Sequence, residues 1–126
     1  MKSIKLFWID DVETWSASAC ENLKIIAPKY GIDLSVVFAA NGEDVCQKLM
    51  MFDFDGVIMD YHMEPFRGNK YIEDIRFEEH LDNIPIIFYS QDNSTNISTL
   101  VSSIRNIITV YRPNLEDKIK ELFFKV

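Results

Sequence analysis

The chain has 126 residues, of which 48% are hydrophobic, and carries a formal net charge of -7. This length and apolar content suit one compact domain, which we place over residues 1–126. The acidic balance and the lack of a basic cluster argue against direct binding to nucleic acid. No apolar run is long enough to span a membrane and no signal peptide is evident, so we expect a cytoplasmic protein without membrane association.

The chain contains two cysteines, Cys20 and Cys46, which both fall within helical patterns. A cytosolic protein keeps such thiols reduced, and we therefore expect buried free thiols and not a structural disulfide.

The first half of the sequence alternates between strand and helix patterns. Residues 4–9 form an apolar run typical of a buried strand, and Gly31 leads into a second such run at 34–39. Between them, apolar residues recur at near-helical spacing: Trp15, Ala19, Leu23, Ile26 and Tyr30. Pro28 is expected to end or kink this helix. Asn41-Gly42 is expected to open a short second helix with Glu43 and Asp44 in its first turn.

The second half continues the same alternation. Strands are predicted at 56–60, 85–90 and 107–111, and a loop at 61–69. A third helix is predicted from about Lys70 to Leu81, with Ile72, Ile75 and Tyr71 facing inward. A fourth helix, capped by Ser94 or Asn93, has an apolar stripe formed by Ile97, Leu100, Val101 and Ile104. A final amphipathic helix after Pro113 contains Leu115, Ile119, Leu122 and Phe123.

Five alternating strands and helices predict right-handed crossovers and a parallel sheet that is covered on both faces. We therefore predict a three-layer, doubly wound (βα)5 domain with the flavodoxin-like strand order 2-1-3-4-5. In that order, strands one and three flank the topological switch point, where ligands bind at the carboxyl ends of the strands.

Three carboxylates follow these two strands: Asp10 and Asp11 after the first, and Asp60 at the end of the third. Carboxylates gathered at one sheet edge repel one another unless a hard divalent cation lies among them. The pattern predicts a Mg²⁺ site, with Asp60 as a candidate phosphoryl acceptor. Ser90 and Arg112 end the fourth and fifth strands.

With these residues in order, the chain resembles the receiver domain of two-component response regulators, as in single-domain chemotaxis regulators. The resemblance spans essentially the whole sequence. It rests on the acidic pair, the later aspartate, a hydroxyl residue, and a basic residue before Pro113.

The resemblance implies phosphorelay signalling. Asp60 would accept a phosphoryl group from the phosphohistidine of a sensor histidine kinase or phosphotransfer protein, or from acetyl phosphate. Asp10, Asp11, Asp60 and the backbone carbonyl of His62 would hold Mg²⁺, while Ser90 and Arg112 would contact phosphoryl oxygens.

The resemblance also implies how the signal leaves the domain. Modification at Asp60 would switch a protein-interaction surface formed by the fourth helix, fifth strand and fifth helix, roughly residues 93–124. A downstream protein would bind there, and homodimerisation through the same face is compatible with the resemblance. The expected activity is that of a phosphoacceptor and not of an enzyme, beyond self-phosphorylation and self-dephosphorylation.

Several positions depart from the family pattern. Arg112 stands where lysine is usual, Gln91 where a small residue is usual, and Thr109 where many relatives have an aromatic residue, with Tyr111 as a substitute on the same strand. Glu64 also displaces Pro65 by one position. These departures motivate an alternative function, an atypical receiver that acts as a phosphorylation-independent protein-interaction module.

Other readings have weaker support. Asp10 and Asp11 could instead cap the first helix. A zinc site at His62 or His80 would need more cysteine or histidine ligands than the sequence offers nearby. Ser90 has no evident His-Asp relay and no G-x-S-x-G motif, so it is a poor candidate for a hydrolase nucleophile. A haloacid-dehalogenase-like phosphatase would need Asp-x-Asp after the first strand. The sequence leaves open whether the domain stands alone or belongs to a longer regulator.

Overall fold

The computed structural model describes residues 1–11, 13–63, 65–91 and 93–125. Its five strands form one sheet in the order β2-β1-β3-β4-β5, and all neighbouring pairs are parallel. The strands are β1 (Lys2–Ile9), β2 (Ile32–Ala39), β3 (Gly56–Asp60), β4 (Ile86–Ser90) and β5 (Ile107–Tyr111). The predicted sheet order and doubly wound architecture are confirmed.

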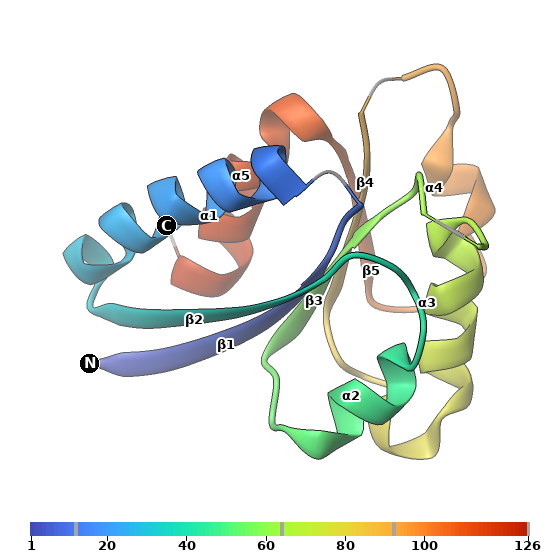
Figure 1. The fold of residues 1–126 in the computed structure, drawn as a ribbon, viewed down its shortest axis with the longest axis horizontal. Coiled ribbons are helices and arrows are strands. Elements are labelled where there is room, and N and C mark those ends of the chain that lie inside the picture. The colour runs from blue at the N-terminus through green and yellow to red at the C-terminus, as the bar shows by residue number, and fades with distance from the viewer. Residues whose placement is uncertain (12, 64, 92, 126) are drawn as a thin grey trace.

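Helices cover both faces of the sheet (Figure 1). They are α1 (Glu13–Ile26), α2 (Val45–Met51), α3 (Gly68–Phe77), α4 (Ile97–Leu100) and α5 (Leu115–Ile119). Short 3-10 turns occupy Ala27–Tyr30, Glu79–Leu81 and Arg112–Asn114, and a wider π turn, Lys120–Phe124, extends α5. Pro28 lies just beyond the end of α1, as its helix-breaking character predicts.

Side-chain alternation along the strands creates two separate cores. Leu6 and Trp8 of β1 pack with α1 and α5, whereas Phe7 and Ile9 pack with α2, α3 and α4. The centre of the sheet is therefore apolar on both faces, as expected for a parallel sheet between two helical layers. None of the helices in the described ranges is long and apolar enough to cross a membrane.

Three predicted helices have different bounds in the structure. The helix expected from about Lys70 to Leu81 is α3 at Gly68–Phe77; Glu78 then adopts an extended conformation, and a separate 3-10 turn follows at Glu79–Leu81. The helix expected from Asn41-Gly42 begins only at Val45, because Asn41 Oδ1 accepts the Glu43 N–H (2.9 Å) in a local turn and Asp44 adopts a left-handed φ of 57°. Glu43 and Asp44 therefore precede the helix and do not lie in its first turn.

The fourth helix is a single turn, Ile97–Leu100, and Asn96 occupies its N-cap position in place of Ser94 or Asn93. Hydroxyl groups compete with helix formation here: Thr99 Oγ1 donates to the Asn96 carbonyl (2.7 Å), and Ser102 Oγ donates to the Thr99 carbonyl (3.2 Å). The apolar stripe is still partly realised, since Ile97 and Val101 are buried.

Candidate functional site

The carboxyl ends of β1 and β3 lie side by side and bring three acidic side chains together. One carboxylate oxygen from each of Asp10, Asp11 and Asp60 lies within 4.8 Å of the other two. Asp10 and Asp60 are buried, with 3% and 0% of their surfaces exposed, whereas Asp11 is exposed. The cluster thus has two carboxylates inside the fold and one at its solvent edge.

The pKa of the Asp60 carboxyl is raised. Burial, followed by the charge of Asp10, raises its pKa from 3.8 to about 7; Asp11 adds to the rise, while a hydrogen bond from the His62 N–H (3.2 Å) and the charge of Arg112 oppose it. One oxygen, Oδ2, is buried and has no hydrogen-bond partner among the residues that the structure describes. A buried carboxylate with an unsatisfied oxygen is costly for a fold unless a ligand uses it.

The chain after β3 folds back closely over Asp60. The Gly68 N–H donates to the Tyr61 carbonyl (2.9 Å), and a Cβ atom at Gly68 would lie 2.1 Å from the Asp60 carbonyl oxygen. Only glycine permits this approach. His62 is half-buried beside the site, and Glu64, which displaces Pro65, lies outside the described residues.

Asp10 is held by an aromatic pair that sequence reasoning missed. The Tyr89 hydroxyl donates to Asp10 Oδ2 and accepts a hydrogen bond from the Trp8 indole N–H (3.0 Å). Tyr89 is fully buried, and burial together with the charges of Asp10 and Asp60 raises its pKa, which keeps the hydroxyl protonated as a donor. The available signal was a hydroxyl-bearing aromatic residue within an apolar strand, one position before Ser90.

Ser90 and Arg112 lie where the predicted strand ends place them. Ser90 is buried, and its backbone pairs in register with Tyr111 of β5. Arg112 is half-buried in the turn after β5, and its guanidinium carbon lies 4.3 Å from the centroid of the Trp15 ring. Gln91, the bulky residue after Ser90, is exposed.

Arg112 does not close the acidic cluster as an ion pair. Within the described ranges, no Arg112 nitrogen lies within 4.0 Å of an Asp60 oxygen, and Nε and Nη2 of Arg112 are buried without hydrogen-bond partners. The site therefore contains unsatisfied donors and an unsatisfied carboxylate oxygen at the same sheet edge.

These groups fit a hard divalent cation. Oxygen-only ligands, two or three carboxylates and a neighbouring backbone carbonyl are what Mg²⁺ takes in proteins, with water completing its coordination. Such a cation would satisfy Asp60 Oδ2 and offset the repulsion among the three carboxylates. The ligand roles of Asp10, Asp11, Asp60 and His62 stay predictions.

No protein-family model and no curated protein matches the sequence. Solved structures do match the fold. The signal receiver domain of a DNA-binding response regulator from Colwellia psychrerythraea 34H has a TM-score of 0.77 at 19% identity, over 94% of this chain and 97% of that chain. The chemotaxis response regulator CheY4 of Vibrio cholerae has a TM-score of 0.78 at 16% identity, over 98% of both chains.

A third structure, the receiver domain of the sensor histidine kinase PA1611 from Pseudomonas aeruginosa PAO1, has a magnesium ion coordinated in its active-site cleft. It matches with a TM-score of 0.72 at 14% identity, over 95% of this chain and 93% of that chain. The chain has the receiver-domain fold.

Within this receiver fold, the face formed by α4, β5 and α5 is hollowed. Thr109 and Tyr111 both line a cavity of about 440 Å³ there, together with residues of α4 and α5. Side chains two positions apart lie on the same side of a strand, which places Thr109 and Tyr111 together on β5. Trp8 is fully buried and Trp15 half-buried. Both cysteines are free thiols; Cys20 is buried as expected, whereas Cys46 is only half-buried.

Proposed function

We propose that this chain is a phosphoacceptor receiver domain that acts in cytoplasmic phosphorelay signalling. The observation that carries the proposal is the buried, unpartnered Oδ2 of Asp60 within a cluster of three carboxylates. A carboxylate that is not engaged by internal hydrogen bonds through both oxygens could bind a cation through one oxygen and attack phosphorus through the other.

In the proposed reaction, a carboxylate oxygen of Asp60 attacks the phosphorus of a phosphohistidine on a sensor histidine kinase or phosphotransfer protein. An O–P bond forms and the P–N bond breaks; its electron pair returns to the imidazole, which takes a proton from solvent. Asp10, Asp11, the other oxygen of Asp60 and the His62 carbonyl would hold Mg²⁺, which would offset the charge of the incoming phosphoryl group.

Ser90 and Arg112 would then hold the product. The Ser90 hydroxyl can donate to one phosphoryl oxygen, and the guanidinium of Arg112 has two buried nitrogens that lack partners in the unmodified state. The chain would act as a stoichiometric phosphoacceptor and not as a turnover enzyme, apart from slow self-phosphorylation and self-dephosphorylation.

The output would be a change in the protein-binding surface formed by α4, β5 and α5. The cavity beside Thr109 and Tyr111 provides space for side-chain rearrangement when Ser90 shifts toward the phosphoryl group. A downstream protein, or a second copy of the chain, would bind this face.

The test is intact mass spectrometry after incubation with Mg²⁺ and acetyl phosphate. We expect one hydroxylamine-sensitive phosphoryl adduct on the wild type and on Asp33→Asn, which changes an exposed carboxylate of β2, and none on Asp60→Asn. An adduct that persists in Asp60→Asn would contradict the assignment.

A cognate kinase then decides between the two functional classes. If neither acetyl phosphate nor the kinase modifies Asp60, and beryllofluoride with Mg²⁺ leaves partner affinity unchanged, the chain is a phosphorylation-independent interaction module.

A further inference from the structure

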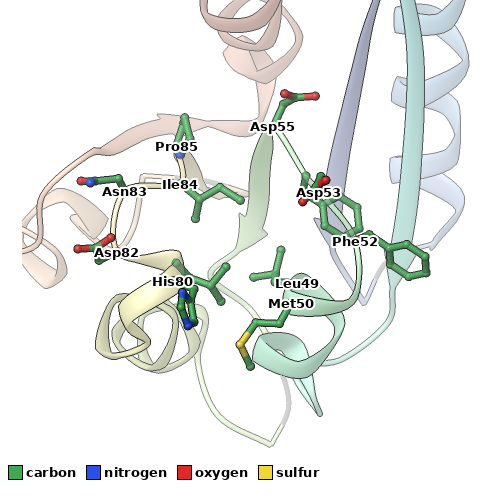
Figure 2. Close-up of a pocket in the computed structure, with 12 residues that line it drawn as sticks. Leu49, Met50, Phe52, Asp53, Asp55, His80, Asp82, Asn83, Ile84 and Pro85 are labelled. Carbon is green, nitrogen blue, oxygen red and sulfur yellow. The ribbon is translucent and has the colours of Figure 1, made fainter.

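A second cavity lies at the opposite edge of the sheet from Asp60. It measures about 680 Å³ and is lined by residues 49–50, 52–55 and 80–85 (Figure 2). These segments lead into the amino ends of β3 and β4, whereas the acidic cluster lies at the carboxyl ends of β1 and β3. The proposed phosphoacceptor chemistry makes no use of this cavity.

One wall of the cavity is apolar and exposed. Phe54 stacks on buried Phe7 with ring centroids 5.2 Å apart, and Phe52 packs edge-on against Phe54 at 6.1 Å. Met50 and Phe52 are each 47% exposed, and the neighbouring Met51 is 70% exposed. Large apolar side chains gathered on a soluble surface mark binding sites, and methionine adapts to varied partners.

Three of the five polar side chains that line the cavity are acidic, and the other two are His80 and Asn83. Its lining contains Asp53, Asp55 and Asp82 but neither Lys nor Arg. Asp82 is paired with exposed Arg105 (3.1 Å), and Asp55 accepts the Lys5 backbone N–H (2.8 Å). Asp53 is exposed and forms no hydrogen bond or ion pair within the described ranges.

Lys5 already contacts the aromatic wall of the cavity. The ammonium of Lys5 lies 4.3 Å from the centroid of Phe52 and 5.3 Å from that of Phe54. This contact shows that the Phe52 ring attracts a cation through its face. Since Lys5 does not line the cavity, the acidic character of the lining remains.

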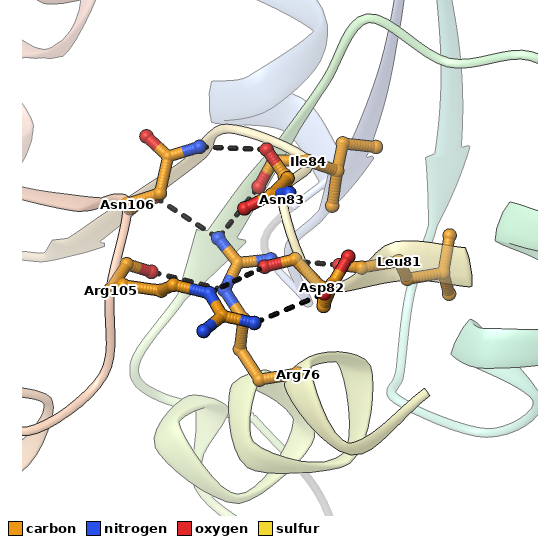
Figure 3. Close-up of polar contacts among 7 residues, drawn as sticks. All are labelled: Arg76, Leu81, Asp82, Asn83, Ile84, Arg105 and Asn106. Carbon is orange, nitrogen blue, oxygen red and sulfur yellow. Dashed lines mark hydrogen bonds and ion pairs between the residues drawn. The ribbon is translucent and has the colours of Figure 1, made fainter. Parts of the chain in front are cut away.

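The opposite wall is held rigidly by an arginine. Arg76 donates to the carbonyls of Leu81 (2.9 Å) and Ile84 (2.6 Å), and also to those of Arg105 and Asn106 (Figure 3). Segment 81–84 is therefore fixed to α3 and to the start of β5. In Figure 2, Met50 and His80 extend from facing walls of the opening. A fixed wall lowers the ordering cost of binding.

We propose that this cavity is a second docking site, which binds a segment of another protein with a large apolar side chain flanked by Lys or Arg. The apolar side chain would contact Met50, Phe52 and Ile84. Its basic neighbours would face Asp53 and Asp55. Two copies of the chain would each present an acidic cavity and a net charge of -7, so charge complementarity disfavours self-association here.

The test is selection of random 12-residue peptides on the immobilised wild-type chain, with counter-selection on Asp53→Lys. Selected peptides are then titrated against wild type, Asp53→Asn, Asp53→Lys and Asp33→Lys. Asp53 and Asp33 are both exposed, so all variants are expected to fold, and far-UV circular dichroism verifies this. Amide chemical shifts of the wild type locate the bound peptide.

We expect selected peptides to combine Lys or Arg with a large apolar residue and to shift amides of residues 49–55 and 80–85. Asp53→Lys should weaken binding by about tenfold or more, and Asp53→Asn by roughly threefold. Asp33→Lys should bind as wild type does, which separates a local effect at Asp53 from the same change in net charge elsewhere on the surface. The proposal would be overturned if no peptide, or only neutral or acidic peptides, were recovered, or if peptides bound Asp53→Lys as well as wild type. Concentration-dependent self-association of the chain through this cavity, without peptide binding, would also overturn it.

Discussion

The guanidinium of Arg112 lies over the indole of Trp15, with its central carbon 4.3 Å from the ring centroid. This cation–π contact holds a positive charge near Asp60 without joining the two as an ion pair. In the proposed function, this arrangement would leave Asp60 open before phosphoryl transfer and keep a cation close to the new anion afterwards. It also gives a physical role to the arginine that replaces the usual lysine.

Replacing Arg112 by Met tests that role. Loss of the contact with Trp15 should lower the stability, whereas removal of two unpartnered buried nitrogens should raise it. The free energy of unfolding should therefore change by less than about 1 kcal/mol. Adduct formation at Asp60 with acetyl phosphate should slow by at least about tenfold, because a charge near the incoming anion is lost. Urea unfolding and time-resolved intact mass measure the two effects.

Arg112→Lys is the matched control, since it keeps the cation and should retain most of the rate. Equal rates in wild type and Arg112→Met would show that the guanidinium has no part in phosphoryl transfer.

Tyr89→Phe probes the support of Asp10. The substitution leaves the buried Trp8 N–H without its acceptor and removes the hydrogen bond that Tyr89 donates to Asp10 Oδ2, which should lower the free energy of unfolding by about 2 kcal/mol. Added Mg²⁺ should recover part of that loss, because a cation offsets the charge of Asp10. Urea unfolding with and without Mg²⁺ measures both. The control is Tyr30→Phe, which changes an exposed tyrosine and should not lower the stability. If Tyr89→Phe were as stable as wild type, the hydrogen bonds of Tyr89 would not contribute to stability.

Much of the fold is readable from the sequence because strands buried on both faces leave unbroken apolar runs. Strands 56–60 and 107–111 have the predicted bounds, and the carboxylates that follow β1 and β3 meet at one edge. The fourth helix was overestimated, since its apolar spacing does not reveal the competition from Thr99 and Ser102 hydroxyls.

The long-range polar contacts were not predictable from residue patterns. Tyr89 meets Asp10 across 79 positions of the sequence, and Arg76 reaches Asn106 across 30. Such contacts depend on how the strand and helix faces are oriented, which short-range periodicity does not encode. The Arg112–Trp15 contact likewise joins a turn after β5 to α1.

The raised pKa of Asp60 predicts a specific pH dependence. Between 3.8 and about 7, folded Asp60 holds a proton that unfolded Asp60 releases, so stability in the absence of divalent cations should fall as pH rises through this window. Above about pH 7, Asp60→Asn should be more stable than wild type by on the order of 4 kcal/mol. Urea unfolding at pH 5 and pH 8, with EDTA present, measures the difference.

Mg²⁺ should reverse this pattern, because cation binding competes with the proton on Asp60. Its apparent affinity, followed by the fluorescence of Trp8 and Trp15, should strengthen as pH rises through about 7. An affinity that is the same at pH 5 and pH 8 would argue against Asp60 as a ligand.

Arg76 is expected to be a principal stabilising residue outside the acidic cluster. Its guanidinium donates four hydrogen bonds to main-chain carbonyls, and together these connect α3, the turn before β4 and the turn before β5 (Figure 3). Burial lowers the pKa of Arg76, but arginine stays charged at any accessible pH.

Arg76→Lys keeps the charge but cannot reproduce the planar fork, and it should lower the free energy of unfolding by about 2 to 3 kcal/mol. Arg105→Lys, which alters an exposed pair with Asp82, should cost less than about 1 kcal/mol. Because Arg76 also fixes segment 81–84, its replacement should increase amide hydrogen exchange there while leaving β1 unchanged. Equal losses in the two variants, or exchange that rises uniformly over the chain, would show that the four hydrogen bonds do not act as a local support of the docking cavity.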